Sequence, residues 1–166
     1  LHEVEKLSRA GHTDWTLADV EFTKGPFMDV NTTTTTLTPA STAAGAGVNI
    51  TASAITGING GVGWLATDIG RQIYFNDGYA VITARTSATV AVATITIAFA
   101  NTNAITAWQL GSFSDTTGFP SCVTFFEQRL VFAGTVSQPQ TIFFSRSGDY
   151  ENMDANIGGT VADDDA

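Results

Sequence analysis

Residues 71–97 have the sequence RQIYFNDGYAVITARTSATVAVATITI, in which β-branched and aromatic residues alternate with small or polar ones. Alternation with a period of two is typical of β-strands, whose successive side chains point to opposite faces of a sheet. The break at Asn76-Asp77-Gly78 provides residues that tolerate the backbone conformation of a tight hairpin turn. The stretch therefore predicts three strands, at 71–75, 79–85 and 89–97.

Similar short runs, bounded by Gly, Asn, Asp or Pro, lie on both sides of this stretch and predict further strands. They are found at 3–8, 15–22, 48–52, 123–126, 129–132 and 140–145. Helical periodicity is hard to find anywhere in the chain. The sequence therefore predicts an all-β fold.

The composition changes twice along the chain. A five-threonine run at 32–36 opens an uncharged stretch that extends to Gly47, and aromatic-rich strands resume at Trp108. This predicts a discontinuous module, 1–36 with 105–166, and a small β-barrel inserted at 37–104. The ends of an insertion lie close together, because it leaves and rejoins its host at neighbouring points. Since the first residue is Leu1, both ends are expected to be cut from a longer polypeptide.

Charge is scarce and unbalanced. Only 14% of residues are charged, and seven Lys plus Arg against sixteen Asp plus Glu give a formal net charge of -9. Low surface charge is common in permanent assemblies, and the negative charge disfavours specific binding to nucleic acid. No apolar run is long enough for a transmembrane helix, so no membrane insertion is expected. The one cysteine, Cys122, lies in an apolar run and is predicted to be a buried, inert thiol.

The sequence predicts no enzymatic activity, no cofactor and no metal site. Glu127 beside Arg129 in a strand is interpreted as a locally balanced charge, and Asp149 as a turn residue. His2 and His12 lack a neighbouring nucleophile or metal ligand, and the acidic stretch 163–165 lacks the ligand spacing of a calcium loop.

Two alternatives stay open. A glycan- or receptor-binding virion module would need exposed aromatic residues, for which the candidates are Trp15, Trp64, Tyr74, Tyr79 and Trp108. A cell-wall-degrading virion enzyme, the less favoured alternative, would need paired carboxylates or an activated nucleophile.

A series of motifs resembles the tail tubular protein B, or nozzle, family of short-tailed bacteriophages. The motifs are Trp15, Gly25-Pro26-Phe27, Trp108-Gln109-Leu110-Gly111, Gly118-Phe119-Pro120-Ser121, the run from Phe125 to Thr135, Gln138 to Ile142 and Ser145 to Asn152. The resemblance implies a β-propeller-like body that forms a homo-oligomeric ring, a hexamer, around the DNA channel of the virion tail. Its partners would be a tail adaptor and tail fibre proteins.

The middle segment resembles the small barrel named after the first catalytic cysteine half-domain of ubiquitin-activating enzymes. The resemblance lies in 68–73, 80–83 and 87–92. It implies a β-barrel insert and carries no ubiquitin chemistry, because 37–104 contains no cysteine.

Five residues of the flanking module are predicted to have structural roles. Arg129 is expected to hold an acidic partner, Asp149, because its planar guanidinium makes several fixed hydrogen bonds. The other structural residues are Glu127, Trp15 and Trp108.

Overall fold

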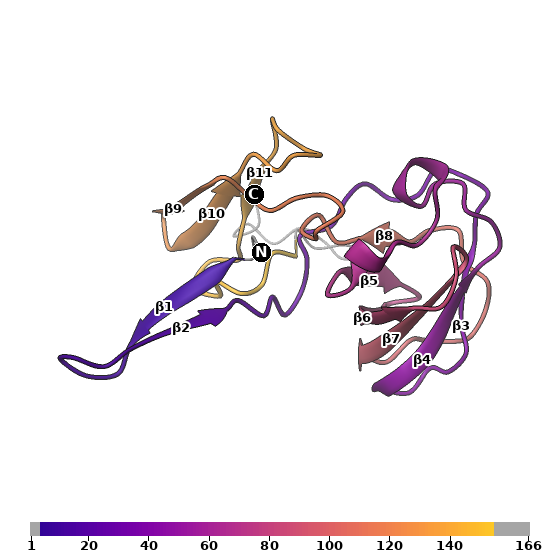
Figure 1. Ribbon diagram of the computed structural model, residues 1–166, viewed down its shortest axis with the longest axis horizontal. Helices are drawn as coiled ribbons and strands as arrows, with labels where there is room; N and C mark the ends of the chain where they lie inside the picture. Colours follow the sequence, from indigo (N-terminus) through magenta and orange to yellow (C-terminus); the bar gives the residue numbers. More distant parts are fainter. Residues whose placement is uncertain (1–3, 155–166) are drawn as a thin grey trace. The chain divides into compact units, whose positions relative to one another are not determined.

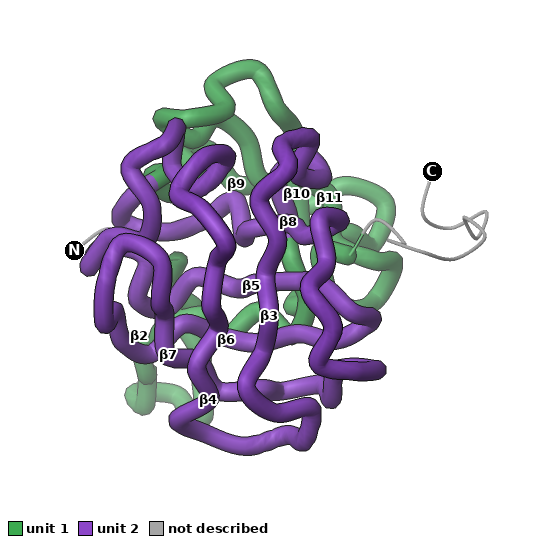
Figure 2. The backbone as a smooth tube through the Cα atoms, turned by 90° about the vertical axis from the view of Figure 1, so that its right-hand side faces the viewer, with its two compact units in different colours: residues 1–25, 117–166 green, residues 26–116 purple. Residues whose placement is uncertain are grey.

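The computed structural model describes residues 4–154, which form short strands joined by turns and loops (Figure 1). Within this range the helical segments are two three-residue 3-10 turns, η1 (Asn59–Gly61) and η2 (Ala66–Asp68). The all-β prediction is confirmed. The chain divides into two compact units, unit 1 with Leu1–Gly25 and Thr117–Ala166, and unit 2 with Pro26–Thr116 (Figure 2).

Unit 1 contains a hairpin and a separate three-stranded sheet. The hairpin joins β1 (Glu5–Arg9) to β2 (Trp15–Asp19), and the sheet has the antiparallel order β11-β10-β9. Its strands are β9 (Cys122–Phe126), β10 (Arg129–Ala133) and β11 (Ile142–Phe144). All five agree with strands that period-two alternation predicts. The two chain segments of the unit meet where the Met153 amide donates to the Lys24 carbonyl oxygen at 2.7 Å.

Unit 2 is a six-stranded antiparallel sheet, curled into a half-barrel, with the order β3-β4-β7-β6-β5-β8. The strands are β3 (Leu37–Pro39), β4 (Gly45–Ala52), β5 (Gln72–Phe75), β6 (Gly78–Arg85), β7 (Val90–Ile97) and β8 (Gln109–Leu110). The predicted hairpin is confirmed, since Asn76 and Asp77 form its two-residue turn with φ of 54° and 58°. Gly78 follows because a Cβ there would lie 2.5 Å from the Phe99 ring.

The segment after β7 closes much of the gap between the two edges of the curled sheet. Ile105 pairs with Leu37 through two backbone hydrogen bonds of 2.9 and 3.0 Å, and β8 then pairs with β5 at the opposite edge. The ends of the predicted 37–104 insert therefore lie side by side. The compact unit is wider than this insert, because residues on both sides of it join the same core.

Trp108 is the main such residue. Its side chain is buried in the core of unit 2, and its Nε1 donates to the Thr35 carbonyl oxygen at 2.9 Å. The sequence-based boundaries at 37 and 105 would leave both residues with the flanking module. They belong to unit 2 because the indole packs in the same buried cluster as Leu37, Ile50 and Phe75, and Thr35 accepts its hydrogen bond.

Candidate functional site

The candidate site lies in unit 1, where the β9–β10 hairpin turns in only two residues. Phe126 pairs with Arg129, so Glu127 and Gln128 form the turn, with φ of 46° and 63°. The prediction that Glu127 lies in a strand is wrong. Positive φ at both positions defines a type I′ turn, which favours Asn-Gly, whereas Glu and Gln adopt it at a cost.

Substitution can relieve the backbone strain in this turn. The double variant E127N/Q128G is expected to raise the free energy of unfolding by about 1–2 kcal/mol, because Asn and Gly tolerate left-handed backbone. Thermal unfolding followed by circular dichroism measures the gain. The control is E127A, which removes the same charge and leaves the backbone strained; an equal gain from E127A would contradict the explanation.

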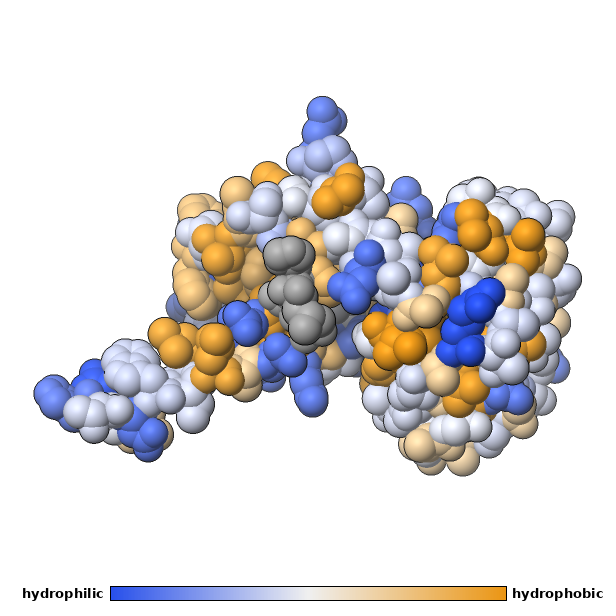
Figure 3. All heavy atoms as spheres, viewed as in Figure 1, coloured by the Kyte–Doolittle hydropathy of each residue, from blue (hydrophilic) through white to orange (hydrophobic). Residues whose placement is uncertain are grey.

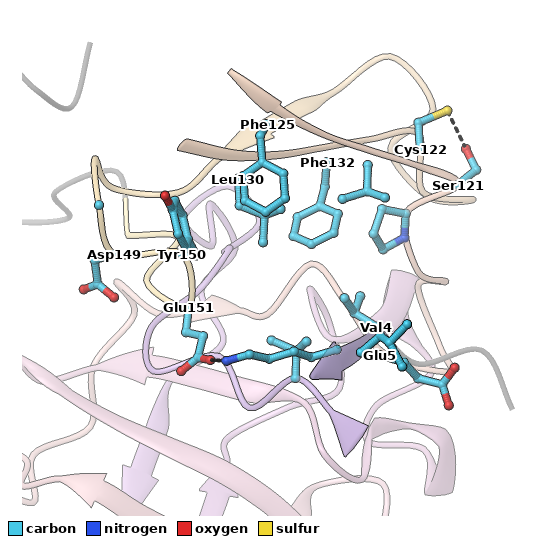
Figure 4. Close-up of a pocket in the computed structure, with 16 residues that line it drawn as sticks. Val4, Glu5, Ser121, Cys122, Phe125, Leu130, Phe132, Asp149, Tyr150 and Glu151 are labelled. Carbon is cyan, nitrogen blue, oxygen red and sulfur yellow. Dashed lines mark hydrogen bonds and ion pairs between the residues drawn. The ribbon is translucent and has the colours of Figure 1, made fainter. Parts of the chain in front are cut away.

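One face of the β9–β10–β11 sheet covers a cavity of about 600 Å³. This cavity face consists of Val123, Phe125, Leu130, Phe132 and Phe143, which the strand register places on the same side. Figure 4 shows Phe125, Leu130 and Phe132 pointing from the strands toward Val4 at the base of β1. Val4, Leu7 and Val20 line the opposite wall, so the cavity is mainly apolar.

The rim of the cavity is acidic. Glu5, Lys6, Asp149 and Glu151 lie there, three carboxylates against one ammonium group. The ammonium is already paired, because Lys6 Nζ lies 2.8 Å from Glu151 Oε1. Tyr150 packs edge-on against Phe125, with ring centroids 5.3 Å apart.

The other side of the sheet, the outer face, is mainly apolar and is exposed around a buried Val131. It comprises Thr124, Phe126, Arg129, Val131, Ile142 and Phe144, together with Cys122 and Ala133. Phe126 and Ile142 are each 58% exposed and Phe144 is 47% exposed. In Figure 3 hydrophobic atoms gather over β9 and β10 and at the root of the β1–β2 hairpin. Three large exposed apolar side chains on one face of a small sheet, one on β9 and two on β11, are typical of a surface that another protein covers.

The five predicted structural residues are not brought together. Arg129 donates from Nη1 to the Ser145 carbonyl oxygen at 3.3 Å, and among residues 4–154 no carboxylate lies within ion-pair distance of it. The predicted partner Asp149 is therefore wrong. It is instead held in the turn where its amide donates to the Arg146 carbonyl oxygen at 3.2 Å.

Trp15 and Cys122 are both exposed. Trp15, 54% exposed, lies under the Arg9 guanidinium at 5.5 Å, a cation–π contact across the hairpin. The prediction of a buried Cys122 is wrong, because β9 is an edge strand with all five of its residues exposed.

The aromatic and histidine candidates have ordinary surroundings. Trp64 and Tyr79 of unit 2 are buried, as is Trp108, so they form no exposed platform for a glycan. His12 accepts from Arg9 at 2.9 Å through Nδ1. His2 and the acidic stretch 163–165 lie outside the described residues. In the part that is described, no three potential metal ligands cluster and no helix is long and apolar enough to span a membrane.

Sequence reasoning missed one buried ion pair in unit 2. Arg71 Nη1 lies 3.0 Å from Asp68 Oδ1, and both side chains are almost completely buried. Arg71 also donates to the Gly111 carbonyl oxygen at 2.7 Å and to Asn59 Oδ1 at 2.7 Å. Burial lowers the pKa of Arg71, whereas Asp68 raises it, and an arginine with this partner stays charged at neutral pH. Because the Arg71 guanidinium is occupied by these partners, we assign it a structural role.

No protein-family model matches the chain, and no curated protein is similar to it in sequence.

Proposed function

We propose that this chain is a non-enzymatic structural module of a short-tailed bacteriophage tail, in which unit 1 is part of a propeller-like body that assembles into a homo-oligomeric ring around the DNA channel. The motifs that resemble the nozzle family lie in unit 1 and at residues 25–27, where unit 2 begins, except for Trp108-Gln109-Leu110-Gly111, which lies in unit 2. The observation that carries the proposal is the outer face, with Phe126, Ile142 and Phe144 about half exposed. Burial of such side chains in a subunit contact stabilises it by about 25 cal/mol per Å² of apolar surface.

The three-stranded sheet is one strand short of a usual propeller blade. Propeller blades usually have four antiparallel strands, whereas β11-β10-β9 has three and leaves β9 at an edge. A contact repeated head to tail around a rotation axis closes a ring. In the proposed ring, each copy packs against the outer face of its neighbour. A tail adaptor and tail fibres would then bind the ring.

The proposal is tested on the state of association of the chain. Sedimentation velocity at chain concentrations between about 10 and 200 μM is expected to show a closed oligomer of one size. Subunit interfaces of standard size stay associated at these concentrations. The variant I142E/F144E is expected to be monomeric, because it places two charges on the outer face. The matched control is V62E/I69E in unit 2, where Val62 is 58% and Ile69 52% exposed. A monomeric parent chain, or equal dissociation in the control, would overturn the ring.

DNA binding provides a second test. A conduit must not retain the DNA that passes through it, and the net charge of -9 with seven basic residues offers no clustered Lys and Arg. We expect no measurable affinity for a short duplex at physiological salt, measured by fluorescence anisotropy. Saturable micromolar binding that weakens steeply with salt would reveal a basic patch and remove the electrostatic support for a conduit.

A further inference from the structure

The free edge of β9 carries backbone groups that have no partner in the sheet. Leu130 donates its amide to Ser145 Oγ at 2.8 Å and accepts from the Ser145 amide at 2.8 Å, so its backbone groups point toward β11. Its cross-strand neighbour Phe125 is therefore in a non-hydrogen-bonded pair, and by alternation so is Val123. The amides and carbonyls of Val123 and Phe125 point outward, where another strand can pair with them.

This edge lacks the features that usually protect edge strands. Natural proteins block such edges with Lys, inward-pointing charge, Pro or a covering segment. The five residues of β9, Cys-Val-Thr-Phe-Phe, carry no charge and no proline, and all five are exposed. Val123 and Phe125 are 64% and 67% exposed. An unprotected edge of this kind is suited to β-strand addition.

The cavity lies directly beside the edge. Directly opposed residues of paired strands project to the same face, so the residues of an added strand opposite Val123 and Phe125 would project to the cavity face. These two residues would be separated by one, and both would meet the apolar cavity of about 600 Å³. A volume of that order accommodates bulky apolar groups.

We propose that β9 accepts an extended segment of a different polypeptide, with apolar side chains at positions i and i+2 and Lys or Arg beside them. The choice of a basic partner follows from the rim, where Glu5 and Asp149 are in excess once Lys6 is paired with Glu151. A second copy is a poorer occupant of this acidic rim, because the chain has only seven Lys plus Arg against sixteen Asp plus Glu and offers few basic segments. This inference goes beyond the ring, whose contacts we place on the outer face.

A proline substitution separates the edge from the fold. V123P removes an outward-pointing amide and changes one exposed side chain of the cavity face, but it removes no amide that donates to β10, so the β9–β10 pairing and the melting temperature are expected to be preserved. T124P removes an amide that donates to β10 and is expected to lower the melting temperature, which shows that the two directions are assigned correctly. E5Q/D149N neutralises the rim.

The probe is a display library of random 12-residue peptides, selected on the immobilised chain. The expected result is enrichment of net-positive peptides with apolar residues at i and i+2. Enrichment is expected to fall at least tenfold on V123P, and the preference for Lys and Arg to be lost on E5Q/D149N. No enrichment on the parent chain, equal enrichment on V123P, or selection of acidic peptides overturns the proposal.

The failure of this inference can be told apart from the failure of the ring. The monomeric variant I142E/F144E is expected to enrich the same peptides, since β9 is unchanged in it. If instead V123P abolishes self-association, a second copy occupies the edge and the inferred partner is wrong. If the parent chain is monomeric yet selects basic peptides, the ring fails and the strand acceptor stands.

Discussion

Replacing Arg71 by methionine is expected to lower the free energy of unfolding of unit 2 by about 3–5 kcal/mol, because it leaves the Asp68 carboxylate buried without its charge partner. Asp68 would keep two donors, the Leu65 amide at 2.8 Å and Asn59 Nδ2 at 2.6 Å, but no cation. Urea unfolding followed by tryptophan fluorescence measures the loss, since Trp64 and Trp108 are both buried in this unit.

Two further variants identify the cause. R71K keeps the charge but cannot reach the Gly111 carbonyl, Asn59 and Asp68 together, so it is expected to recover only part of the loss. R71M/D68L removes both charges and is expected to be more stable than R71M alone, because no uncompensated ion remains. A decrease of less than about 1 kcal/mol in the free energy of unfolding of R71M would show that the ion pair does not stabilise unit 2.

Replacing Trp108 by alanine is expected to lower the free energy of unfolding of the same unit by about 3–5 kcal/mol, through lost burial and the cavity that remains. The indole is 3% exposed and joins the segment after β7 to the core. Its Nε1 hydrogen bond to Thr35 also disappears. Urea unfolding followed by circular dichroism avoids the loss of the fluorescent residue.

Trp15 gives the matched control, because it is the same residue type at 54% exposure. W15A is expected to change the free energy of unfolding by less than about 1 kcal/mol, the value of an exposed cation–π contact. Equal losses in the two variants would contradict the placement of Trp108 in the core. A small loss in W108A would indicate that the curled sheet is held closed without the indole.

The strands could be predicted because alternation and turn residues are local properties. Asn76-Asp77 predicts a tight turn, because both residue types tolerate positive φ, and the structure has a hairpin turn there. Glu127-Gln128 adopts the same kind of turn without such a signal. There the pairing of β9 with β10 imposes the turn, and tertiary pairing overrides local preference.

Burial could not be predicted, because it depends on what covers a strand. The apolar run around Cys122 is typical of a strand buried on both faces, yet β9 lies at an edge and is exposed. The hydrogen bonds of the buried Arg71 could not be predicted either, because one of its partners is distant in sequence. Asp68 is three residues away, but the acceptor Gly111 is forty residues away in sequence, so its approach follows only from the closure of the sheet.

The adjacent ends of unit 2 have a consequence for the order of folding. The Ser112 amide donates to the Pro26 carbonyl oxygen at 2.8 Å, so the chain leaves this unit beside the point where it entered. Closing a flexible loop as long as Pro26–Thr116 costs on the order of 4 kcal/mol in chain entropy. Once unit 2 has folded, that cost is already met, and the two distant segments of unit 1 behave kinetically as neighbours.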